Sequence, residues 1–156
     1  MKSKLESVFN SGWQFRYFQL MKLPSLFFWG IKVHHIDSDR AEVTIPYRWT
    51  TQNPFASIYF SAIAGAAELS TGLLAFLAIE GNNISFLVVG VNGKFYKKAT
   101  TKTLFICDQG QLIRDAVNRA ISTGQGEILT VKSLGYNVQR EVVAEFDFTW
   151  SFKKRS

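Results

Sequence analysis

Residues 53–80 read NPFASIYFSAIAGAAELSTGLLAFLAIE, and this stretch decides the fold. Apolar and small residues fill nearly every position, so the stretch lacks the polar face of a surface helix. Asn53 followed by Pro54 is a favourable helix start, because asparagine accepts orphan amide hydrogens and proline at the first position loses no needed donor. Gly81 and Asn82 supply a stop. The pattern predicts a buried helix, thin enough for a sheet to pack closely around it.

The segments on either side of this helix have the pattern of strands. Before it, residues 31–47 alternate apolar and polar side chains around a turn at 37–39, which predicts a hairpin. After it come strand candidates at 84–98 and 102–108, separated by a short polar turn. Because most of these connections are too short for the crossovers of a parallel sheet, we expect antiparallel hairpins.

The two ends of the chain complete the predicted order. Residues 1–24 have a loosely helical pattern that a proline ends, typical of a flanking helix or a lid. Asp108 is expected to cap a second, amphipathic helix that Gly124 closes. Strand candidates follow at 127–138 and 142–152, the second with an apolar residue at every other position. The order predicts an α+β fold with an antiparallel sheet.

Composition favours one globular domain over residues 1–156, because 47% of the chain is apolar and 19% charged. The single cysteine, Cys107, can form neither an internal disulfide nor a metal cluster, which favours a cytoplasmic protein. We expect Cys107 to be a core residue. The net charge of +6 is spread out, without a nucleic-acid-binding motif. Residues 55–79 are long enough to span a membrane, but Glu68 and the many small residues favour a buried helix.

Two segments carry a family resemblance: the run Asn53, Pro54, Phe55, Ala56, Ser57, Ile58, Tyr59, Phe60, Ser61, Ala62, Ile63, Ala64, Gly65, Ala66, Ala67, Glu68 and the strand end Phe95, Tyr96, Lys97, Lys98, Ala99. Together they resemble the hotdog superfamily of thioesterases. The similarity is to the phenylacetate-pathway type branch and its relatives of uncharacterised function, over about residues 31–152. It implies a hotdog fold, in which a curved antiparallel sheet wraps a long central helix. Such a sheet alone leaves a strand edge and one side of the helix uncovered, so we expect a homodimer or tetramer.

The resemblance also implies site residues. Asn53 matches the family's loop asparagine and Glu68 matches an acid on its helix, whereas Tyr59, Phe60 and Ser61 replace the family's His-Gly-Gly turn. Some members carry a serine or threonine on the strand after the helix, where this chain has Val88 or Val89. The family's His-Gly-Gly element thus has no counterpart, which leaves a non-catalytic hotdog protein that binds an acyl or lipid ligand as the alternative function.

Glu68 is the candidate catalytic residue. A carboxylate on an apolar helix is costly to bury unless it has a partner. The positions three and four residues away hold no lysine or arginine, so that partner comes from another segment, another subunit, water or a ligand. The resemblance implies that Glu68 attacks a thioester carbonyl or activates a water, for which a pKa raised by burial is suited. The alternative is a structural glutamate at a dimer interface.

The remaining candidates surround the helix start. Asn53 either positions the carbonyl or the water, or simply caps the helix. The backbone amides near Tyr59 and Phe60 supply the oxyanion site in the family, where the helix begins later than Pro54; the resemblance thus implies a loop over residues 50–58.

Three lysines follow the strand after the helix. Lys97, Lys98 and Lys102 lie where the family binds the phosphates of coenzyme A, and the alternative is a solvated basic turn. His34 and His35 fall on a strand, which disfavours a dehydratase of this fold, since that enzyme needs a loop histidine. The chain is therefore expected to hydrolyse acyl-coenzyme A or a related thioester, with coenzyme A only as part of the substrate, no other cofactor, no metal and no nucleic acid.

Overall fold

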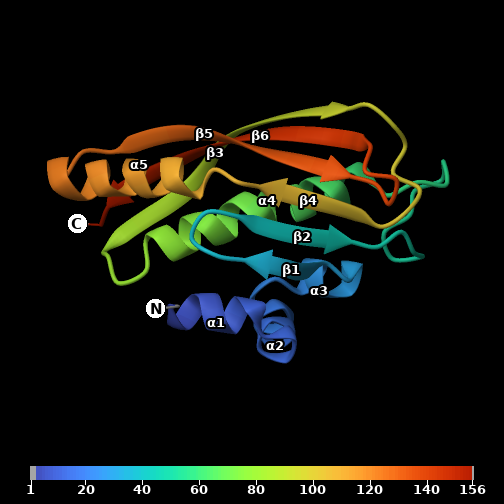
Figure 1. The fold of residues 1–156 in the computed structure, drawn as a ribbon, viewed down its shortest axis with the longest axis horizontal. Coiled ribbons are helices and arrows are strands. Elements are labelled where there is room, and N and C mark those ends of the chain that lie inside the picture. Colours follow the sequence, from blue (N-terminus) through green and yellow to red (C-terminus); the bar gives the residue numbers. More distant parts are fainter. Residues whose placement is uncertain (1–2, 156) are drawn as a thin grey trace.

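A six-stranded antiparallel sheet wraps around one long helix in the computed structural model, which describes residues 3–155 (Figure 1). In chain order the elements are α1 (Lys4–Asn10), α2 (Gly12–Lys22), α3 (Pro24–Trp29), β1 (Lys32–Ile36), β2 (Ala41–Ile45), α4 (Phe60–Ala78), β3 (Ile84–Phe95), β4 (Thr103–Cys107), α5 (Gly110–Thr123), β5 (Glu127–Tyr136) and β6 (Val142–Lys154). The predicted α+β hotdog architecture, with its central helix and curved antiparallel sheet, is confirmed.

The strand order across the sheet is β1-β2-β4-β5-β6-β3. The predicted hairpin of β1 with β2 is present. The predicted hairpin of β3 with β4 is wrong, because β3 lies at an edge and pairs with β6, while β4 pairs with β2 and β5. The segment between them does not make a tight turn. It packs on the loop before α4, where the Ile58 amide donates to the Ala99 carbonyl at 2.8 Å.

Helix α4 forms the centre of the core. Its buried side chains include Ala62, Ala66, Leu69 and Leu74, and they pack against the inward residues of β6, Phe146, Phe148, Trp150 and Phe152. The polar groups that are buried with them are hydrogen-bonded: the Trp150 indole donates to Thr71 at 3.1 Å, and Ser70 and Ser133 share a bond of 2.7 Å. The sequence pattern thus placed the core correctly on both elements.

The start of α4 differs from the prediction made from Asn53 and Pro54. The helix begins at Phe60 after Tyr59, and residues 50–58 form a loop, as the resemblance implies. Asn53 therefore does not cap the helix. Its side-chain oxygen accepts the amides of Phe55 and Ser57 at 2.9 and 3.3 Å, which closes a turn within the loop.

The capping assignment for the second helix was also wrong. Gln109 occupies the position before α5, and Asp108 does not cap it. The Gln109 side chain instead accepts the Lys132 amide of β5 at 2.6 Å, so it joins helix and sheet. Gly124 does close the helix in a left-handed conformation. Cys107 is a core residue as predicted, and burial raises the pKa of its thiol to about 11.

The N-terminal segment is three short helices and not one flanking helix over 1–24. As predicted, the helical pattern ends before Pro24, since α2 ends at Lys22 with Leu23 as its cap. Pro24 itself occupies the first turn of α3, where a proline lacks no needed donor. Gln19 is a buried residue of α2, and its side chain donates to the Ile31 carbonyl at 3.0 Å, which ties the segment to the start of β1. Residues 1 and 2 of the predicted flank lie outside the described part of the chain.

One helix among residues 3–155, α4, is long and apolar enough to cross a membrane. More than half of its most apolar window is buried within the fold. The sheet curves over this helix (Figure 1), as expected for the core helix of a globular domain.

Candidate functional site

Glu68 lies on the side of α4 that the sheet leaves uncovered. The half-buried residues of this side form one stripe along the helix: Ser61, Ala64, Gly65, Glu68 and Gly72. Burial raises the pKa of the Glu68 carboxyl from 4.5 to about 7. Within residues 3–155 no group donates a hydrogen bond to this carboxyl or forms an ion pair with it. The acid is thus near its titration midpoint at neutral pH, without a partner among the described residues.

A small apolar cavity of about 150 Å³ adjoins Glu68. The other lining residues are apolar: Phe9, Phe18, Leu23, Leu69, Gly72, Leu73, Phe76 and Phe86. They come from α1, α2, the α2–α3 junction, α4 and β3, and the ring of Phe76 lies 5.9 Å from Phe9 and 6.0 Å from Phe86. The arrangement suits an apolar group of a few carbon atoms held beside an acid.

Gly72 makes room for the Glu68 carboxyl. A Cβ atom on Gly72 would lie 3.1 Å from Glu68 Oε1 and 3.4 Å from the Trp150 ring. The Trp150 ring is itself held by its hydrogen bond to Thr71. The carboxyl therefore occupies a space beside the fixed Trp150 indole, and this space exists because Gly72, one turn further along the helix, has no side chain.

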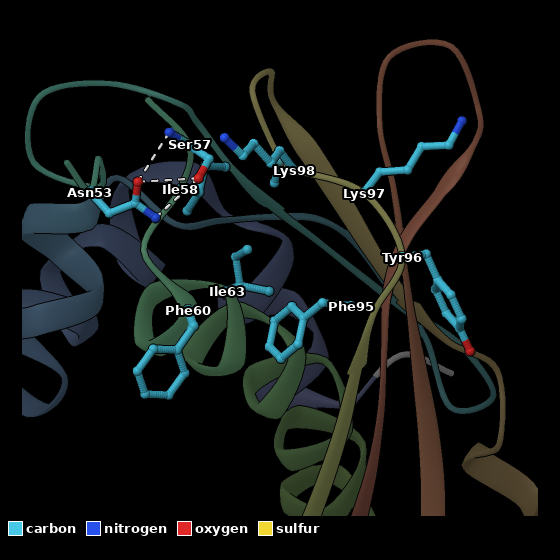
Figure 2. Close-up of a pocket in the computed structure, with 10 residues that line it drawn as sticks. Asn53, Ser57, Ile58, Phe60, Ile63, Phe95, Tyr96, Lys97 and Lys98 are labelled. Atoms are coloured by element: carbon cyan, nitrogen blue, oxygen red, sulfur yellow. Dashed lines mark hydrogen bonds between the residues drawn. The ribbon is translucent and has the colours of Figure 1, made fainter. Parts of the chain in front are cut away.

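A second cavity, of about 360 Å³, opens at the N-terminal end of α4 (Figure 2). It is lined by Asn53, Ser57, Ile58, Phe60, Ile63, Phe95, Tyr96, Lys97, Lys98 and Ala99. Both polar ends of the Asn53 side chain are already bonded within its loop, since its amide nitrogen also donates to Ser57 Oγ at 3.0 Å. Asn53 thus shapes the wall of this cavity through the loop.

Two backbone amides at the start of α4 are free. In the described part of the chain, the amides of Phe60 and Ser61 have no acceptor, as is usual in the first turn of a helix. The Tyr59 amide is not available, because it donates to the Thr51 carbonyl at 2.7 Å. Of the two amides named from the sequence, the Phe60 amide can therefore contribute to an oxyanion site and the Tyr59 amide cannot.

The three predicted phosphate-binding lysines do not form one cluster. Lys97 and Lys98 are on the rim of the second cavity with side chains pointing to different sides, and Lys102 is outside its lining (Figure 2). Lys97 pairs with Glu141 at 2.6 Å. Lys98 reaches toward the Asn53 loop, where its amino group lies 3.5 Å from the Phe55 carbonyl. Lys98 is thus the lysine best placed to meet an anionic group at this cavity.

The structure does not bring Asn53 and Glu68 of one chain together. Glu68 is eight positions beyond Phe60, which is about 12 Å along the helix. It also lies about 140° around the helix axis from Ile63, which lines the second cavity. The two cavities consequently open in different directions from α4.

Sequence reasoning did not identify the aromatic lining of the Glu68 cavity. Phe9, Phe18 and Phe76 are far apart in the sequence, and nothing local links them. The spacing of aromatic residues in the N-terminal segment did indicate a helix with an apolar face. It did not indicate which part of the protein that face covers. Val88 and Val89 lie on the edge strand β3, the first half-buried and the second exposed.

The histidines and acids elsewhere do not suggest a metal site. His35 bonds to Asp37 at 2.9 Å on the surface, and His34 lies 3.9 Å from Glu42. Among residues 3–155 there is no group of three His, Cys, Asp or Glu side chains that could hold a metal ion.

Residues 12–152 match a family described as a domain of unknown function, DUF4442. The chain belongs to the DUF4442 family. A comparison with curated protein sequences gives no match.

Solved structures with the same architecture resemble this DUF4442 chain over most of its length. A protein of unknown function from Chlorobaculum tepidum superposes with a TM-score of 0.77 and 16% identity, covering 93% of this chain and 98% of that one. A thioesterase from Haemophilus influenzae gives 0.69 and 17%, covering 87% of each chain. A mutant thioesterase from Pseudomonas aeruginosa gives 0.70 and 12%, covering 92% and 94%. The hotdog fold implied by the resemblance of residues 53–68 and 95–99 is thus confirmed.

Proposed function

We propose that this DUF4442 protein hydrolyses a thioester of a small apolar acyl group, with Glu68 as the catalytic residue. One observation carries the proposal: a carboxyl with no partner within residues 3–155 and a pKa raised to about 7 adjoins a cavity whose other lining residues are apolar. Perturbed acids in such cavities are typical of active sites. The thioesterases of Haemophilus influenzae and Pseudomonas aeruginosa, which share the fold, support the same reaction class.

The chemistry needs the ionised form of Glu68. As a general base, the carboxylate takes a proton from water while the water oxygen attacks the thioester carbonyl. The tetrahedral oxyanion collapses, the carbon–sulfur bond breaks, and the leaving thiolate takes the proton back from Glu68. As a nucleophile, the carboxylate would attack the carbonyl itself and release the thiolate, and water would then hydrolyse the anhydride.

The second cavity is proposed to hold the polar part of the thioester. The free amides of Phe60 and Ser61 point out from a helix N-terminus, where developing negative charge is stabilised. Lys98 supplies a positive charge nearby for an anion such as a coenzyme A phosphate.

A dimer would join the two cavities. Helix α4 runs antiparallel to β3, because Phe76 near its end contacts Phe86, while Phe60 at its start shares the second cavity with Phe95. If two β3 edges pair about a two-fold axis, the end of one β3 meets the start of the other. The partner's Asn53 loop would then approach the stripe of α4 that carries Glu68. We therefore propose a homodimer with two composite sites.

Light scattering at micromolar concentration is expected to give a dimer. The edge strand β3 is long and exposes Leu87, Val89 and Val91, which is the pattern of an interface. Introducing Leu87→Lys with Val91→Lys places like charges near the two-fold axis, so this variant should be monomeric. A matched exchange of exposed apolar residues elsewhere, Leu112→Lys with Val138→Lys, should leave the dimer intact. A monomeric wild-type protein contradicts the proposal.

Hydrolysis is tested with a panel of acyl-coenzyme A substrates that differ in chain length and in aromatic content. The protein should release free thiol fastest from short or aromatic acyl groups, because the Glu68 cavity of about 150 Å³ is small. The alternative function, an acyl-binding protein without catalysis, is favoured by the bulky, exposed Tyr59 and Phe60, which stand in place of the first two residues of the family's His-Gly-Gly turn. It predicts an acyl ligand that co-purifies and binds tightly without thiol release.

Gly72→Ala is expected to lower kcat about tenfold with little change in stability. The added methyl group would lie 3.1 Å from the Glu68 carboxyl and displace it. Displacing a catalytic group commonly lowers the rate by about tenfold or more. Replacing glycine inside a helix stabilises it by about 1 kcal/mol, which offsets the crowding. Steady-state kinetics and thermal unfolding check both parts. Gly12→Ala, where an added Cβ meets nothing within 4 Å, is the control for the substitution itself.

A further inference from the structure

Helix α2 carries aromatic side chains on both of its faces. Phe15 and Gln19 point into the fold and are buried. On the opposite face, Trp13, Tyr17 and Met21 follow one another at intervals of four residues and are 74%, 65% and 60% exposed. Leu20 extends this outer face. We call Trp13, Tyr17, Leu20 and Met21 the α2 outer face, and such an exposed apolar stripe indicates a contact with something outside the chain.

The charge around the α2 outer face is positive. No aspartate or glutamate occurs in residues 7–36, whereas Arg16, Lys22 and Lys32 do. Arg16 donates to the Phe27 carbonyl at 3.2 Å, and a further guanidinium, that of Arg48, lies by the same end of α3. The basic side chains and the lack of acids in this segment are complementary to an anionic surface.

A second copy of the chain does not fit this face. In a symmetric contact the same patch lies on both subunits, so two α2 outer faces would bring their basic residues together. The proposed dimer moreover uses the edge strand β3. Figure 1 places α1 and α2 beside β1. The inner side of α2 shares the Glu68 cavity with Phe86 of β3, whereas no residue of the α2 outer face lines that cavity, so this face points away from the β3 side.

We propose that the α2 outer face docks on the surface of an anionic lipid bilayer. Tryptophan and tyrosine side chains prefer the boundary between headgroups and acyl chains, and flanking lysines are attracted to anionic headgroups. The helix would lie in the plane of the interface, as amphipathic peripheral helices do. Such docking requires no membrane span and no turnover, so it stands whether or not Glu68 is catalytic.

Docking through α2 would bring the bilayer close to two cavities of the protein. Phe18, on the inner side of α2, lines the Glu68 cavity. Phe15 and Arg16 line another cavity of about 220 Å³, together with Lys32 of β1. A single helix thus separates the proposed lipid surface from both cavities, and an apolar acyl ligand in the bilayer would have a short path into the protein.

Vesicle co-sedimentation of the full chain tests the proposal. The protein should bind vesicles of phosphatidylcholine and phosphatidylglycerol in equal parts, and bind phosphatidylcholine alone at least about tenfold more weakly. Trp13→Ser with Tyr17→Ser and Met21→Ser should weaken binding to the anionic vesicles by at least about tenfold, because the apolar contact is lost. Lys22→Glu with Lys32→Glu should have an effect of similar size, about tenfold or more.

A matched control removes exposed apolar side chains elsewhere. Leu112→Ser with Ile121→Ser and Val138→Ser should bind vesicles like the wild type. Circular dichroism verifies that every variant is folded. In a Trp49→Phe background, which removes the other highly exposed indole, Trp13 fluorescence should shift to the blue on anionic vesicles.

Three outcomes would overturn the proposal: equal binding to both kinds of vesicle, no binding to either, or binding that the α2 variant retains. If the wild-type protein ignores vesicles but forms larger species that the α2 variant does not form, the face joins copies of the chain and the lipid proposal fails.

Discussion

The Glu68→Gln variant is expected to lose thioester hydrolysis, with kcat lower by about a thousandfold. Glutamine keeps the shape of the side chain and can occupy the same space between Gly72 and the Trp150 ring. It cannot take a proton from water or attack a carbonyl, so both proposed roles of Glu68 end with this change. The loss should appear in kcat while the protein remains folded, because the interaction removed is made in the transition state.

The pH dependence of the wild-type enzyme should identify the same group. The pKa of Glu68 is raised to about 7 by burial, and the ionised form is the active one. The rate should therefore rise about tenfold per pH unit below that value and level off above it. An ordinary exposed carboxylate would give a profile that is flat through this range.

Glu127→Gln is the matched control for the activity measurement. Glu127 makes an ion pair with Arg119 at 3.0 Å at the exposed start of β5, and such pairs contribute little to stability. This variant should retain wild-type kcat. Unchanged activity of the Glu68→Gln variant would rule out Glu68 as the catalytic residue. If both variants keep full activity, another group of the protein catalyses the reaction.

Local patterns predicted the core elements well. In β6, alternation alone placed Phe146, Phe148 and Phe152 on the inner face, because a strand turns successive side chains to opposite sides. The continuous apolar character of α4 likewise required a helix covered on several sides. These features depend only on neighbouring residues, so the sequence is sufficient to predict them.

Strand order and helix boundaries depend on contacts that local patterns do not contain. The separation of β3 from β4 arises from the pairing of β3 with β6, about sixty residues later in the chain, as in the pair Val91 and Phe148. The start of α4 was predicted wrongly because Asn53 and Pro54 suit a turn as well as they suit a helix start. Asp108 is not the cap because α5 begins one residue later than predicted, after Gln109, whose side chain bonds to β5.

The candidate site was predictable only in part. Glu68 stood out because an acid inside an apolar helix demands compensation. Its surroundings did not, since Phe9 and Phe18 reach the same cavity from the N-terminal helices through tertiary packing. The three lysines were grouped by sequence proximity, but the backbone turns Lys97 toward Glu141 and Lys98 toward the Asn53 loop.

The same Glu68→Gln change is expected to make the protein more stable above neutral pH. In the unfolded chain Glu68 titrates near its ordinary value of 4.5, whereas in the folded protein burial raises its pKa to about 7. Between these values the folded state binds more protons than the unfolded state, so the free energy of unfolding falls as the pH rises. Above the folded pKa the buried charge costs about 3 kcal/mol, given about 1.4 kcal/mol per pKa unit.

Glutamine carries no charge at any pH and avoids this cost. Urea unfolding at about pH 8 should therefore show the variant more stable by up to about 3 kcal/mol, while at about pH 4 the two proteins should agree within about 1 kcal/mol. Both must be compared at one protein concentration, since a dimer gains stability by mass action. Equal stability at the higher pH would mean that water or a partner already solvates the carboxylate. Glu68 would then lack the raised pKa on which its role as a base at neutral pH depends.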